Sequence, residues 1–107
     1  MGYLVYDGTS RIQLEDRVLA HVEMVIILKF RRREGFAMRW RDSSASGDGR
    51  SVIWLDPSMP LRLHYEGSRP IAINKEWLEA LASAAATNSG LELVDEEGEA
   101  ITGTLVS

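Results

Sequence analysis

The densest group of chemically active side chains in this sequence is basic. Between Lys29 and Arg41 there are six basic residues and one acid, Glu34, with Trp40 among them. Basic side chains neutralise nucleic-acid phosphates, and an aromatic ring can stack on a base. The alternative is a helix C-terminus followed by a solvated strand face, with Trp40 in the core. With one later arginine, the candidate nucleic-acid or phosphate patch consists of Lys29, Arg31, Arg32, Arg33, Arg39, Arg41 and Arg62.

Other reactive chemistry finds little support. The two histidines, His21 and His64, stand at no metal-ligand spacing, and His21 lies one helical turn from Arg17, which predicts a polar surface residue. The absence of cysteine excludes disulfides, thiolate catalysis and cysteine-ligated zinc. The chain has neither a G-x-S-x-G elbow nor a G-x-x-x-x-G-K loop. We therefore predict no catalytic residues, no metal and no cofactor.

The C-terminal segment, residues 92–107, is acidic. From Glu92 to Glu99 it holds five acids and no base. Glu96 and Glu97 are adjacent in what reads as an exposed run, so we expect neither to have a shifted pKa. The segment is also a possible internal partner for the basic patch. The sequence leaves open whether that patch binds nucleic acid or the chain's own acidic segment.

A helix from Asp16 to Arg33 is expected to organise the molecule. Asp16 is a plausible N-cap, and three arginines end the segment, where the helix dipole favours cations. A buried strand over Val22 to Phe30 is the alternative, because that stretch is rich in β-branched residues. The apolar stripe that would face the core comprises Val18, Leu19, Val22, Val25, Ile26 and Phe30. Met24, Ile27 and Leu28 lie off this stripe, which favours a cover beyond one sheet face, such as a second copy of the chain.

The remaining segments alternate between strand patterns and one further helix. We expect that helix to begin at an Asn74 N-cap and to stop at the segment Thr87-Asn88-Ser89-Gly90. Segment 51–56 is apolar on both faces, which predicts a central strand. Three successive strand patterns from residue 35 to 66 predict an antiparallel meander, and loop 42–50 is expected to be flexible. The expected strands are 3–6, 11–15, 35–42, 51–56, 61–66 and 91–95, with residues 101–106 a further short strand or an ordered tail.

These elements predict a single α+β domain over residues 1–107. We expect one antiparallel sheet of about five strands, with both helices packed mainly on one face. The other face would carry Arg39, Arg41, Arg62 and His64. The net charge of −4 argues mildly against a dedicated nucleic-acid binder. No signal-peptide pattern or membrane-length apolar run is visible, so we expect a cytoplasmic protein without membrane contact.

Two segments point to a known family. D-R-V-L-A-H at residues 16–21 and W-L-D-P-S-M-P-L at residues 54–61 resemble short uncharacterised actinobacterial proteins, often labelled ATP-dependent DNA ligase. The resemblance covers nearly the whole chain and implies a cytoplasmic bacterial protein. A ligase forms lysyl-AMP on the lysine of a K-x-D-G motif. The two lysines here, Lys29 and Lys75, head K-F-R-R and K-E-W-L, so the residues do not support ligation.

Three functional hypotheses follow. The first is a protein of unknown function that acts as a non-catalytic, self-associating interaction module, with a homodimer or another protein as partner. The second is a nucleic-acid-binding accessory protein associated with DNA ligation or repair. The third is a small enzyme, including an ATP-dependent DNA ligase, which the missing nucleophile motif opposes.

Overall fold

The structure, a computed structural model, describes residues 1–106 as strands and two helices in one α+β arrangement. The α+β class is as predicted. The expected sheet of about five antiparallel strands is wrong, because these residues form a seven-stranded mixed sheet. The elements are β1 (Gly2–Tyr6), β2 (Ser10–Leu14), α1 (Asp16–Arg31), β3 (Phe36–Asp42), the 3-10 turn η1 (Ser44–Ser46), β4 (Arg50–Leu55), β5 (Leu61–His64), α2 (Lys75–Ala85), β6 (Leu91–Glu92) and β7 (Thr102–Val106).

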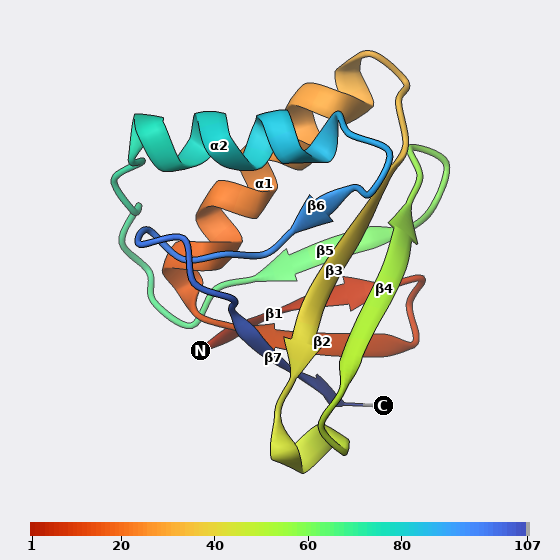
Figure 1. Ribbon diagram of the computed structural model, residues 1–107, viewed down its shortest axis with the longest axis vertical. Coiled ribbons are helices and arrows are strands. Elements are labelled where there is room, and N and C mark those ends of the chain that lie inside the picture. The colour runs from red at the N-terminus through yellow and green to blue at the C-terminus, as the bar shows by residue number, and fades with distance from the viewer. Residues whose placement is uncertain (107) are drawn as a thin grey trace.

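The strand order is β4-β3-β7-β2-β1-β5, and β6 pairs separately with β3. β7 pairs antiparallel with β2 and parallel with the end of β3, so it joins two halves of the sheet. In Figure 1 the β3–β4 hairpin runs across the direction of β1, β2 and β5. The predicted meander is wrong after β4, because β5 leaves its sequence neighbour and pairs with β1 instead.

β4 is an edge strand, and its prediction as a central strand is wrong. Val52 and Trp54 point away from the core and remain 51% and 52% exposed. An apolar run on both faces usually indicates a strand covered on both sides. Here no second layer covers the outward side chains of β4 within residues 1–106, so the apolar pattern marks exposed surface.

The core lies between the two helices and one face of the sheet. Strand alternation directs Phe36, Met38 and Trp40 into it, together with Leu4, Ile12 and Leu14 from the other half. α1 contributes the predicted stripe, with Phe30 half-buried, and α2 contributes Trp77 and Leu81. We call the opposite surface of the sheet the open face. The strand registers place Arg39, Arg41, Arg62 and His64 on it.

α1 confirms the helix and excludes the alternative strand. Its N-cap is Glu15, not Asp16. The Asp16 carboxylate instead accepts the backbone N–H groups of Gly67 and Glu66, at 2.9 and 3.2 Å, and these bonds lower its pKa. The helix ends at Arg31, and Arg33 adopts a left-handed backbone with φ 57°. In the described residues, no helix is long and apolar enough to cross a membrane.

Candidate functional site

His21 is fully buried where the two helices meet, so its prediction as a surface residue is wrong. Its Nε2 accepts the backbone N–H of Asn74 at 2.9 Å, and its Nδ1 lies 2.8 Å from the carbonyl oxygen of Arg17. Because a backbone N–H can only donate, Nε2 is unprotonated and Nδ1 carries the proton. The ring packs on Trp77 with centroids 4.2 Å apart. Burial is tolerated because both ring nitrogens are paired.

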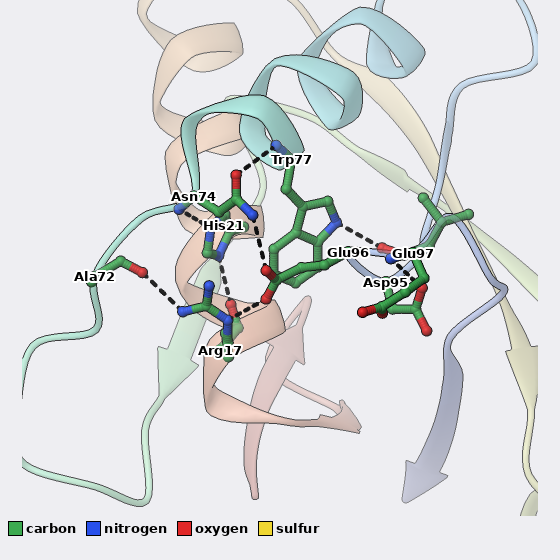
Figure 2. A network of polar contacts seen from close by, with 9 residues as sticks. Arg17, His21, Ala72, Asn74, Trp77, Asp95, Glu96 and Glu97 are labelled. Atoms are coloured by element: carbon green, nitrogen blue, oxygen red, sulfur yellow. Dashed lines mark hydrogen bonds and ion pairs between the residues drawn. The ribbon is translucent and has the colours of Figure 1, made fainter.

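A second set of bonds extends this contact to the acidic segment (Figure 2). Arg17 donates through Nε to Glu96 and through a terminal nitrogen to the carbonyl of Ala72 at 3.0 Å. Asn74 Nδ2 donates to the other Glu96 oxygen at 2.9 Å. The Arg17 bond and then the Asn74 bond lower the pKa of Glu96 to about 2. The expectation of no shifted pKa is therefore wrong for Glu96.

We call this set of residues the clamp, and it consists of Arg17, His21, Asn74, Trp77 and Glu96. Asn74 is the predicted N-cap of α2, and its side chain accepts the backbone N–H of Trp77 at 3.2 Å. Trp77 Nε1 donates to the carbonyl of Val94 at 2.9 Å. The clamp thus ties α1, the start of α2 and the acidic segment together (Figure 2). Since its polar groups are paired within the chain, its geometry is that of a structural contact.

The surface of α1 beyond the clamp is apolar. Met24, Ile27 and Leu28 are 36%, 41% and 43% exposed, and their i, i+3, i+4 spacing places them on one side of the helix. We call these three residues the outer stripe. Met24 also lines a groove of about 380 Å³ between α1 and the segment from Tyr65 to Ile73. The same helix therefore packs one apolar side in the core and exposes a second.

Two lining residues of this groove, Tyr65 and Glu23, share a short hydrogen bond. The hydroxyl of Tyr65 donates to Glu23 Oε1 at 2.6 Å. Burial, followed by this bond to a carboxylate, raises the pKa of Tyr65. The remaining walls are largely apolar, with Pro70, Ile71 and Ile73 opposite α1. The bond pairs the Tyr65 hydroxyl with one oxygen of Glu23 within the chain.

The predicted basic patch is divided among three places. Lys29, Arg31, Arg32 and Arg33 surround the C-terminal end of α1, where Lys29 pairs with Glu34 at 3.3 Å. Arg39 and Arg41 lie on the open face of β3, and Arg62 lies on β5 at the far edge of the sheet. The acidic segment supplies an ion-pair partner to Arg17, outside the patch.

The aromatic residue of the patch also differs from the expected one. Trp40 is buried and its Nε1 donates to Asp42 Oδ1 at 3.0 Å, so it cannot stack on a ligand. Trp54 is the exposed tryptophan on the open face, directly opposite Ala37. The alternation within residues 51–56 indicates that Trp54 faces away from Leu55, since Ile53 and Leu55 share one side while Val52 and Trp54 share the other.

The described residues contain no group of three or more His, Asp or Glu side chains that could hold a metal ion. His21 and His64 are on different faces of the fold, one in the core and one exposed on β5. The candidate site is the outer stripe together with the groove beside it.

A family model described as Domain of unknown function (DUF7882) matches residues 1–96. The chain belongs to this family. The DUF7882 match includes both helices, the outer stripe and all the residues of the clamp, and β7 lies beyond it. The family description assigns no activity, and the protein's function is unknown. No curated protein and no solved structure matches the chain.

Proposed function

We propose that this protein is a non-catalytic interaction module that self-associates through the outer stripe of α1. One observation carries the proposal. Met24, Ile27 and Leu28 form a second apolar side on a helix whose first apolar side already fills the core. A helix that is apolar on two sides is typical of one covered on both, and contiguous exposed apolar residues mark contact surfaces.

The charges beside the stripe support a second copy as the partner. Asp16 and Glu23 belong to the N-terminal half of α1, whereas Arg31 and Arg32 stand at its C-terminal end. Two copies packed with antiparallel α1 helices would place Asp16 and Glu23 of each near Arg31 and Arg32 of the other. The helix dipoles would also be opposed. A two-fold contact of this kind is self-complementary, as a homodimer requires.

Sedimentation equilibrium at tens of micromolar protein tests the proposal. We expect the wild-type chain to sediment as a dimer and Leu28→Lys to sediment as a monomer, because the lysine places a charge at the centre of the contact. Val52→Lys is the matched control, since Val52 is similarly exposed but lies on the sheet. A monomeric wild type at these concentrations would refute self-association.

The alternative functions have different support. Nucleic-acid binding by the predicted patch loses its aromatic residue, because Trp40 is buried. Enzymatic ligation rests on the sequence resemblance alone. Of the two lysines in the chain, Lys29 is paired with Glu34, and Lys75 is the first residue of α2. We therefore place the interaction module first.

A further inference from the structure

Two arginines face each other across the β3–β4 hairpin. Arg41 and Arg50 are directly opposite in the strand register, and both are exposed on the open face. Like charges in this arrangement repel each other. Among residues 1–106 neither takes part in an ion pair. The nearby Asp42 carboxylate is occupied by Trp40 Nε1 and by Ser51 Oγ, at 3.0 and 2.7 Å.

A small hollow adjoins this pair. Its volume is about 190 Å³, and its lining includes Arg39, Arg41 and Arg50 with a single acid, Glu92. Arg39 donates through its Nε to the carbonyl of Ser89 at 2.9 Å, and Glu92 is its register neighbour on β6. With three arginines and one acid in its lining, the hollow is positively charged. Several arginines in the lining of one hollow suit a phosphate group.

An exposed aromatic ring lies further along the same face. Trp54 is on the same side of β4 as Arg50 and Val52, roughly 13 Å from Arg50 at strand spacing. Its ring packs closely on Gly35, where an added Cβ would lie 2.9 Å from a ring carbon. Its neighbour across the hairpin is the small Ala37, so the ring stays 52% exposed. The ring also lines a hollow of about 520 Å³ beside the end of α2, and a half-exposed ring in this position can stack on a base.

We infer that the open face of the β3–β4 hairpin binds single-stranded nucleic acid, with backbone phosphate at Arg41 and Arg50 and a base stacked on Trp54. Charge complementarity accounts for the first contact and stacking for the second. A single strand fits better than a duplex, because duplex bases are already stacked on each other. Because the net charge of the chain is −4, binding depends on where basic residues gather and not on the overall charge.

Fluorescence anisotropy with a labelled oligothymidylate of about 12 nucleotides, an oligouridylate and a duplex of equal length tests this inference. We expect both single strands to bind, the duplex to bind more weakly, and affinity to fall as salt increases. Trp54→Ala should weaken binding about tenfold. The double variant Arg41→Gln/Arg50→Gln should weaken it at least as much and lower the salt dependence.

Arg62→Gln is the control for position: it removes one positive charge, where the double variant removes two, from the open face at the far edge of the sheet. We expect its affinity to stay within about twofold of wild type. The absence of binding at low salt would overturn the inference, as would an equal loss in Arg62→Gln or equal affinity for the duplex. Binding of an acidic peptide without oligonucleotide binding would also overturn it. Leu28→Lys should bind oligonucleotide normally, so this result is separable from self-association.

Discussion

His21 shows how a titratable residue can have a structural task. Its neutral ring accepts a hydrogen bond from the backbone N–H of Asn74 and donates one to the carbonyl oxygen of Arg17. It therefore joins the start of α2 to the first turns of α1. Protonation would place a second N–H against the backbone N–H of Asn74. The ring also supports Trp77. His21 therefore contributes packing and two hydrogen bonds, and all of them are lost together when it is removed.

We predict that His21→Ala lowers the free energy of unfolding by about 2–4 kcal/mol, because it leaves a cavity and an unpaired backbone N–H at Asn74. Urea denaturation monitored by circular dichroism measures this change. His64→Ala is the control: its ring stacks on Tyr3 at an exposed site, and we expect a change of about 0.5 kcal/mol or less. Equal losses in both variants would contradict the assigned role of His21.

Glu96 makes the stability of the fold depend on pH. Its pKa is about 2 in the folded chain against an ordinary value of 4.5. Folding therefore favours the ionised carboxylate. This stabilisation is fully present above pH 4.5 and is lost as the pH falls toward 2. Asp16 has a lowered pKa too and adds an effect of the same sign.

We predict that Glu96→Gln reduces the loss of stability between about pH 5 and pH 2, because the variant lacks the group that titrates there. Urea denaturation across this range measures how the free energy of unfolding changes with pH. Glu97→Gln is the matched control, since Glu97 is an exposed neighbour outside the clamp. Unchanged slopes in Glu96→Gln would contradict the importance of the Arg17–Glu96 pair for acid stability.

At the scale of the elements, local periodicity predicted α1 and α2 and most strands to within a residue or two. It did so because burial repeats every 3.6 residues on a helix and every second residue on a strand. Periodicity does not determine which strands pair. The sequence order suggested that β5 follows β4 in the sheet, whereas β5 pairs with β1 at the other edge. Because the strand pairing was not known, the exposed apolar side of β4 was interpreted as a second buried side.

The candidate site was predictable to the same limited extent. The outer stripe follows from helical spacing alone, so Met24, Ile27 and Leu28 were identified from the sequence. The clamp was not, because Arg17 and Glu96 are separated by 79 positions in the chain. The arginine pair of the hairpin also requires the register, since Arg41 precedes the loop at residues 42–50 and Arg50 ends it, and the sequence does not show how the two align.

At the scale of the whole molecule, β7 decides whether the sheet is continuous. It bonds to β2 on one side and to the end of β3 on the other, so it connects the two halves of the sheet around one core. Gly103 stands at the join, buried against Trp40. A Cβ at that position would lie 2.8 Å from Trp40 Cδ1, in a ring that Asp42 fixes by a hydrogen bond. The indole has little freedom to move away.

We predict that Gly103→Ala destabilises the fold by about 1–3 kcal/mol, because overpacking against a fixed ring displaces β7 from both neighbouring strands. Thermal unfolding followed by circular dichroism in the near and far ultraviolet measures the melting temperature. The near-ultraviolet signal of the tryptophans should change together with it. Gly67→Ala is the matched control. Its added Cβ would meet Asp16 Oδ2 at an ordinary 3.5 Å, so its melting temperature should stay close to wild type. If Gly103→Ala is as stable as Gly67→Ala, β7 can shift without destabilising the core. The stability of the two halves of the sheet would then not depend on their connection through β7.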